Sequence, residues 1–202
     1  MTTVIIIAIT AIVSIMSFKQ PELLNKLKFN ANLVWHKKEY YRLITHGFVH
    51  ANWEHLIINM IVLLSFGRTV EAYFQYIFGQ PSIIYYLILY FGGMLASNAY
   101  ALIKHKDNYH YNAVGASGAV SAVLFASIFF APWEKVYFFG ALPIPGIVFA
   151  ILYLAYSYYM SRKNQDNIAH DAHFLGAVFG FIFPAILDFS LIKHFADQLI
   201  PF

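Results

Sequence analysis

Long apolar runs alternate with short polar breaks along this chain. A helix that crosses the hydrocarbon layer of a membrane needs about 20 predominantly apolar residues, and several of these runs approach or exceed that length. The runs predict helices over residues 3–18, 53–78, 83–103, 116–131, 146–160 and 168–189. We therefore expect an all-α membrane protein in which six transmembrane helices form one bundle.

The connections between these runs differ in character. Residues 19–52 alternate polar positions with aromatic ones such as Trp35 and Tyr40. Because Trp and Tyr concentrate at membrane surfaces, this first loop is expected to lie in the interface and not in water. Residues 131–145 contain three prolines and predict a connection between helices, and residues 161–167 are the most polar stretch. Only a short tail is expected after the sixth helix.

Composition agrees with a membrane protein. Hydrophobic residues make up 60% of the chain and charged residues 11%, whereas soluble domains have about 45–50% and about 25%. Six helices use about 120 of the 202 residues, so a single domain over residues 1–202 is expected. The first run lacks a basic leading segment and a small-residue cleavage site, so we expect a retained helix in place of a signal peptide.

Charge and cysteine content exclude several classes of function. The chain has no cysteine, which excludes a thiol nucleophile, a disulfide framework and a thiolate metal site. The net charge is only +3 and no basic stripe is interleaved with aromatics, so nucleic acid is not an expected partner. Most Lys and Arg residues lie in the first, third and fifth loops, which would place the termini outside by the positive-inside rule.

Polar residues interrupt the apolar runs in three clusters. Strongly polar side chains inside a membrane helix cost about 3 kcal/mol and usually have a function or a partner. The first cluster comprises His46, His50, His55 and Asn59. His55 and Asn59 are four residues apart and share a helix face. Hydrogen bonds that join two helices would explain the same pattern.

The second cluster is Gly115-Ala116-Ser117-Gly118 at the start of the fourth helix. Glycines on both sides allow another backbone or a substrate to approach the serine closely. A helix N-terminus also offers unpaired N–H groups and the positive end of the helix dipole, which can stabilise an oxyanion. A capping serine with small-residue packing is the alternative explanation.

The third cluster lies on the sixth helix. His173, Gly176 and Gly180 follow an i, i+3, i+7 stripe, with His170 one turn nearer the loop. The GxxxG spacing permits close helix contact, which could bring the imidazole to a hydroxyl on a neighbouring helix. A packing motif with a hydrogen-bonded histidine is the alternative.

Together the clusters supply a nucleophile, a base and an amide donor near one membrane face. These groups are the components that acyl transfer requires. Neither Asp171 nor Asp188 has an obvious geometry for orienting the base, so the sequence predicts a Ser117–His173 dyad and not a triad. No cofactor and no metal are expected.

At these residues the chain resembles the rhomboid family of intramembrane serine proteases, at the size of its minimal six-helix form. The matching segments are residues 41–50 (YRLITHGFVH), His55-x-x-x-Asn59, Gly115-x-Ser117-Gly118 and His173-x-x-Gly176-x-x-x-Gly180. The resemblance covers nearly the whole chain and implies a rhomboid-like bundle with a membrane-embedded first loop. It also implies a serine endopeptidase that cuts single-span or multi-span membrane proteins in or near their transmembrane helices, within the lipid bilayer.

The resemblance assigns catalytic roles to four residues. Ser117 corresponds to the family's nucleophile and His173 to its general base. His55 and Asn59 correspond to side chains of the oxyanion hole, together with the backbone N–H of Ser117.

The resemblance also implies structural roles. Arg42 corresponds to an arginine that organises the first loop, and Glu71 to an acidic residue that helps to hold that loop, although Glu71 could equally pair with Arg68. Support from small residues is implied at Gly115, Gly118, Gly176 and Gly180. The family often has an aromatic residue four positions after the nucleophile. This chain has Ser121 there, so another residue must hold His173.

The family implies termini in the cytoplasm and an active site toward the non-cytoplasmic side, opposite to the charge count. We follow the resemblance and expect a multi-pass protein of a bacterial plasma membrane. Two alternatives stay open. A metal-binding or metal-transporting membrane protein could use His46, His50, His55, His170 and His173, although position 47 is Gly where His-Glu-x-x-His has Glu. An inactive rhomboid-like binder would keep the fold without the chemistry.

Overall fold

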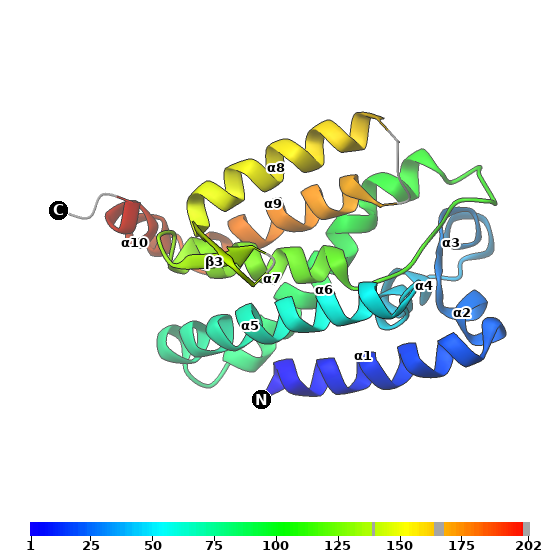
Figure 1. Ribbon diagram of the computed structural model, residues 1–202, viewed down its shortest axis with the longest axis horizontal. Coiled ribbons are helices and arrows are strands. Elements are labelled where there is room, and N and C mark those ends of the chain that lie inside the picture. The colour runs from blue at the N-terminus through cyan, green and yellow to red at the C-terminus, as the bar shows by residue number, and fades with distance from the viewer. Residues whose placement is uncertain (139, 164–167, 200–202) are drawn as a thin grey trace.

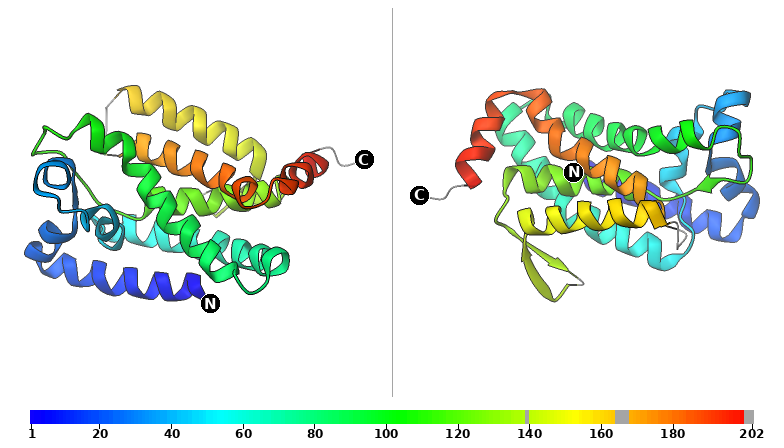
Figure 2. Two further views of the ribbon diagram at one scale, coloured as in Figure 1. Left: turned by 180° about the vertical axis from the view of Figure 1, so that it is seen from behind. Right: turned by 90° about the horizontal axis from the view of Figure 1, so that it is seen from above.

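The computed structural model describes residues 1–138, 140–163 and 168–199. Within these ranges the principal helices are α1 (Thr2–Lys19), α5 (Trp53–Phe78), α6 (Ser82–Lys104), α7 (Ser117–Phe130), α8 (Gly146–Lys163) and α9 (His170–Leu187). They lie side by side in one bundle, with α7 in its middle (Figures 1 and 2). The predicted all-α bundle is confirmed, and each helix agrees with its expected range to within about one turn.

The central helix α7 is shorter than its neighbours. Its 14 residues extend about 21 Å, less than the roughly 30 Å of membrane hydrocarbon. Every residue of α7 from Gly118 to Phe130 is buried, because α5, α6 and α9 pack around it. Among the described residues, α1, α5, α6 and α9 are long and apolar enough to cross a membrane. Figure 1 shows α7 beginning short of the end of α5, and its first residue, Ser117, is half-buried.

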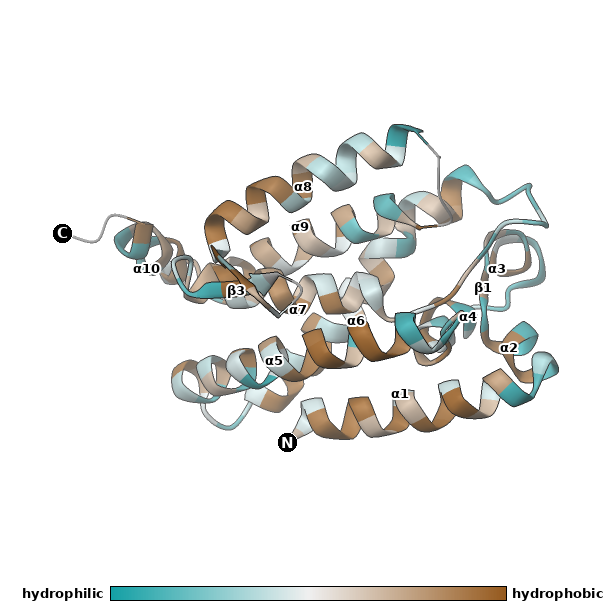
Figure 3. Ribbon diagram, viewed as in Figure 1, coloured by the Kyte–Doolittle hydropathy of each residue, from teal (hydrophilic) through white to brown (hydrophobic). Residues whose placement is uncertain are grey.

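Helix α1 directs its polar residues inward. Its buried positions are Thr3, Ile6, Thr10, Ser14 and Ser17. The isoleucines at positions 5, 9 and 12 are exposed, and apolar colour covers most of α1 in Figure 3. Lipid solvates these side chains, while small polar residues allow α1 to approach α5 closely. The outward apolar surface is therefore the surface expected of a protein in a bilayer.

The first loop is folded. It contains α2 (Pro21–Leu27), β1 (Phe29–Asn30), α3 (Ala31–Lys37), α4 (Arg42–Thr45) and the 3₁₀ helix η1 (His46–Phe48). These elements gather at one end of the bundle beside α1 and α5 (Figure 1). β1 pairs antiparallel with β2 (Asn112–Ala113), with Phe29 opposite Ala113. His36 also lies 3.0 Å from Asp107, so the first loop is joined to the connection between α6 and α7.

The opposite end of the bundle contains two features that the sequence did not indicate. Within the predicted connection, β3 (Lys135–Phe138) and β4 (Leu142–Pro145) form an antiparallel hairpin. Both are edge strands, which tolerate the prolines of β4. Where only a tail was expected, α10 (Ser190–Leu199) follows α9. Its Phe195 ring stacks on Phe129 of α7 at 5.1 Å. Residues 164–167 of the expected polar loop lie outside the described residues.

Candidate active site

Ser117 and His173 are in hydrogen-bond contact. The Oγ atom of Ser117 lies 2.8 Å from Nε2 of His173. Ser117 is the first residue of α7, and His173 lies in the first turn of α9. Both side chains are half-buried. A hydroxyl within reach of an imidazole is the arrangement needed for a serine activated by a general base.

Small residues bring α7 and α9 into direct backbone contact. A Cβ atom at Gly176 would collide with the carbonyl oxygen of Gly118, and one at Gly180 with the backbone of Ala122. On the other side of α7, a Cβ at Gly118 would collide with Ser97 of α6. Only helices without larger side chains at these points can approach so closely. The contact places the first turn of α9 against the start of α7.

The backbone before Ser117 adopts a conformation that favours glycine at position 115. Gly115 has a φ of +109°, and a Cβ there would lie 2.5 Å from Cε1 of His55. The N–H of Gly115 donates to the carbonyl of His46 at 2.9 Å, and the N–H of Ala116 donates to Nε2 of His50 at 3.4 Å. These bonds hold the backbone that enters α7, whose first N–H groups lack partners within the helix.

His55 and Asn59 stand on the neighbouring helix α5. Asn52 caps the start of α5 by accepting from the N–H of His55 at 2.8 Å. Asn59 is buried one turn further along, and its side-chain amide donates to the carbonyl of His55 at 2.8 Å. Because an amide carries two N–H donors, this bond leaves a second one for another acceptor.

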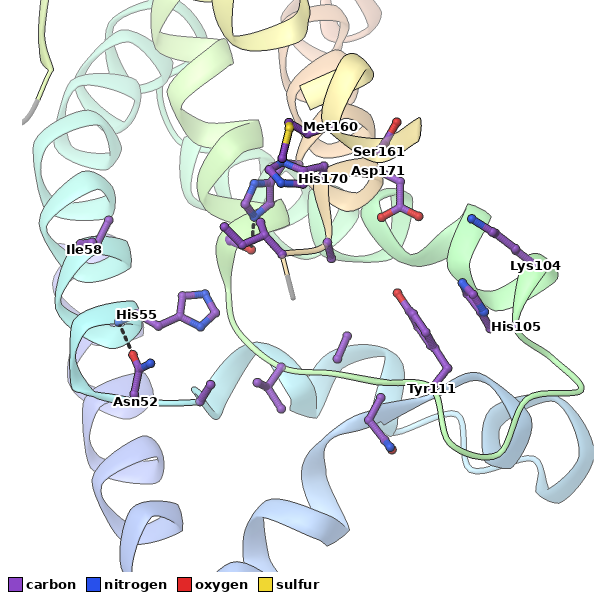
Figure 4. Close-up of a pocket in the computed structure, with 18 of the residues that line it drawn as sticks. Asn52, His55, Ile58, Lys104, His105, Tyr111, Met160, Ser161, His170 and Asp171 are labelled. Carbon is purple, nitrogen blue, oxygen red and sulfur yellow. Dashed lines mark hydrogen bonds between the residues drawn. The ribbon is translucent and has the colours of Figure 1, made fainter. Parts of the chain in front are cut away.

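A cavity of about 780 Å³ opens beside the serine and the imidazole. Ser117, His173 and His55 contribute to its wall. Its charged and polar lining includes Glu54, Lys104, His105, His110 and Asp171. In Figure 4, His55 projects from α5 toward the cavity, with Tyr111 and His105 across it. Charged walls attract water, which hydrolysis consumes.

The carboxylates on and beside α9 are bound to backbone groups. Asp171 accepts from the N–H of Ala172 at 2.9 Å. Asp188, at the far end of α9, accepts from the N–H of Ser190 at 2.8 Å. Each of these two contacts holds a carboxylate against the backbone next to it in the chain.

A family model for the Rhomboid domain matches residues 37–188. This range contains the paired serine and histidine, the two α5 side chains and both glycine contacts. The chain belongs to the rhomboid family. Its fold is that of an integral, multi-pass membrane protein.

Two curated rhomboid relatives align with much of the chain. RHOMBOID-like protein 12, mitochondrial, from Arabidopsis thaliana is 29% identical over 150 residues, which cover 67% of this chain and 43% of that protein. Rhomboid-related protein 1 from Caenorhabditis elegans is 25% identical over 172 residues, which cover 80% of this chain and 44% of that protein. The chain thus spans less than half the length of these relatives. They come from a plant and a nematode, so they do not support a bacterial plasma membrane.

Arg42 joins several parts of the first rhomboid loop. Its guanidinium donates to the carbonyls of Asn25 and Lys28, both at 2.9 Å, and to the Glu39 carboxylate at 2.6 Å. The hydrogen bond from Arg42 is the main reason that the pKa of Glu39 lies below its ordinary value. Arg42 is buried, so these contacts fix the segment around α2 against α4.

Glu71 contacts the start of α1, and its part in holding the first loop stays a prediction. Its Oε1 atom accepts from the N–H of Thr3 at 3.1 Å and from the amino group of Met1 at 3.0 Å. These groups form the start of α1, whereas the first loop follows Lys19 at the other end of that helix. Glu71 therefore stabilises the N-terminus of α1, where unpaired N–H groups favour a carboxylate.

The histidines considered as metal ligands have separate partners. His46 Nε2 lies 2.6 Å from the Asn98 amide, and His50 Nδ1 lies 2.9 Å from the Ser14 hydroxyl. Within the described part of the chain, no three His, Asp or Glu side chains gather in a group that could hold a metal ion. His46 and His50 thus support the loop that leads into α7.

One contact in the site was not foreseen. Ser121, at the position where the family often has an aromatic residue, lies 2.7 Å from the hydroxyl of Tyr153 on α8. The sequence of α8 contains several tyrosines, and spacing alone does not distinguish the one that faces α7.

Proposed function

We propose that this rhomboid protein is an intramembrane serine endopeptidase with Ser117 as nucleophile and His173 as general base. The observation that carries the proposal is the 2.8 Å contact between Ser117 Oγ and His173 Nε2. It lies beside a cavity large enough for a peptide segment and within a bundle whose outer surface suits lipid. We further propose that residues 1–202 act as one domain.

The proposed reaction proceeds through an acyl-enzyme. Nε2 of His173 accepts the Ser117 proton while Oγ attacks the substrate carbonyl. The oxyanion that forms is stabilised by the backbone N–H of Ser117 and by the side chains of His55 and Asn59. The tetrahedral intermediate collapses as His173 gives its proton to the leaving amine. A water molecule, activated by the same imidazole, then releases the acyl group and restores the serine.

The proposed substrates are single-span or multi-span membrane proteins. A helix in lipid keeps its backbone hydrogen bonds internal, whereas a scissile bond must be extended to enter the site. Substrate helices with glycine or other weak helix formers near the cleavage point would unwind at a lower cost. Replacing such residues with leucine should slow cleavage, and equal rates for both substrates would argue against this requirement.

The cavity is proposed to face the non-cytoplasmic side. The chain has no native cysteine. A single Asp107→Cys replacement, in the exposed connection between α6 and α7, therefore introduces the one thiol that can be labelled. A membrane-impermeant maleimide should label this thiol in intact cells. Labelling only after lysis would place the cavity on the cytoplasmic side.

A fluorophosphonate probe tests the proposed chemistry. Such probes react with a serine that a base has activated. The wild-type protein in detergent should be labelled on Ser117, and the Ser117→Ala and His173→Ala variants should not be labelled. An inactive binder would stay unlabelled in every form. A metal-dependent protein would contain bound zinc or another metal ion and would lose function in a chelator.

A further inference from the structure

A ring that packs beside an imidazole can help to fix its orientation, and Ser121 on α7 carries no ring. The structure places the phenol ring of Tyr153 beside His173, from α8. The Tyr153 and His173 rings are inclined by only 21°, with their centroids 6.4 Å apart. At the other end of the phenol, the hydroxyl lies 2.7 Å from Ser121 Oγ. The small residue at position 121 therefore anchors an aromatic ring that another helix provides.

The Tyr153 ring is fixed on more than one side. It lies 5.4 Å from the ring of Phe125 on α7 and 5.7 Å from the ring of Phe149, one turn earlier on α8. Aromatic pairs at such distances have preferred geometries, and the hydroxyl contact sets the rotation of the phenol. A ring held at both ends can restrict the imidazole beside it, whereas a mobile side chain could not.

We infer that Tyr153 is a positioning residue for His173, held in place by Ser121. The inference rests on the proposed Ser117–His173 chemistry. It gives α8 a part in a site whose nucleophile and base belong to α7 and α9. Tyr153 does not touch the reacting atoms. It acts by keeping Nε2 of His173 directed at Ser117, because a misplacement of about 1 Å can lower a rate about 100-fold.

The test compares replacements at the ring and at its anchor. Tyr153→Leu removes the ring, and it should lower kcat by about 10-fold to 100-fold with little change in KM. It should also slow fluorophosphonate labelling of Ser117. Tyr153→Phe and Ser121→Ala each remove one hydroxyl but keep the ring, so their kcat should fall by only a few-fold. Tyr159→Leu is the matched control, since Tyr159 lies on α8 but is 54% exposed.

A relocated ring separates positioning from general packing. The double variant Ser121→Tyr with Tyr153→Ala moves the phenol from α8 to α7, into space that the first tyrosine has vacated. It should recover kcat relative to Tyr153→Ala alone. A thermal unfolding midpoint in detergent close to that of the wild type shows that each variant is folded. If neither Tyr153→Leu nor Tyr153→Ala folds, the double variant is compared with the wild-type protein. A kcat within a few-fold of the wild-type value then supports the inference, and a fall of about 10-fold or more in the folded double variant contradicts it.

Two other results would overturn the inference. One is an unchanged kcat and labelling rate in folded Tyr153→Leu. The other is a loss confined to KM, which would assign Tyr153 to substrate binding. Failure of the proposed function looks different, because the wild-type protein itself would then neither cleave a substrate nor react with the probe.

Discussion

At the residue scale, the side-chain amide of Asn59 offers a direct test of the oxyanion hole. One amide N–H donates to the carbonyl of His55, and the other is assigned to the oxyanion. One such donor is typically worth about 10²–10³ in rate. Asn59→Ala should therefore lower kcat by that factor and change KM little, because the charge exists only in the transition state. Steady-state kinetics on a cleavable substrate measures both.

Ser65 provides the control for this prediction. It lies on the same helix, is exposed, and donates to the carbonyl of Ile61 four residues earlier, as Asn59 does to His55. Ser65→Ala loses the same kind of bond away from the cavity, so it should keep wild-type kinetics. A variant of Asn59 whose only defect is a higher KM would show that the amide binds substrate, and the oxyanion assignment would be dropped.

At the element scale, the contact between α7 and α9 determines the site geometry. A Cβ at Gly180 would collide with the backbone of Ala122, so Gly180→Ala must push the helices apart. Such overpacking typically costs about 1–3 kcal/mol. We expect a lower thermal unfolding midpoint in detergent and a slower cleavage rate, although Gly180 lies two turns from His173. Ala72→Val adds bulk at an exposed position of α5 and should change neither. Full activity with an unchanged midpoint in Gly180→Ala would mean that the helices need not be this close.

The elements that could be predicted are those with strong local signals. Long apolar runs set the bounds of α1, α5, α6, α8 and α9 because lipid solvates their outer faces. The apolar run of α7 has a different cause, since the other helices bury it. The β3–β4 hairpin and α10 were missed because their segments are short, with four residues in each strand and ten in the helix. Phe195 of α10, for example, is placed by the Phe129 ring on which it stacks, and this contact joins distant parts of the chain. The short helices of the first loop likewise depend on tertiary contacts such as those of Arg42.

At the scale of the whole molecule, the partners that side chains meet across the bundle were harder to predict than the candidate site residues themselves. Motif spacing suggested that Ser117 and His173 would meet, since both begin helices at one membrane face. It did not show which end of the bundle Glu71 would reach, because helical periodicity defines a face but not the partner that packs there. Nor did it identify Tyr153, since its contact with Ser121 joins residues 32 positions apart.

The most direct measurement is cleavage of a single-span model substrate by the purified protein in liposomes. The wild-type protein should cut the substrate in or near its transmembrane helix. Ser117→Ala and His173→Ala should each lose activity by several orders of magnitude while staying folded, and the double variant should be no worse than either single one. Substantial cleavage by Ser117→Ala, or none by the folded wild-type protein across varied substrates, would contradict the account.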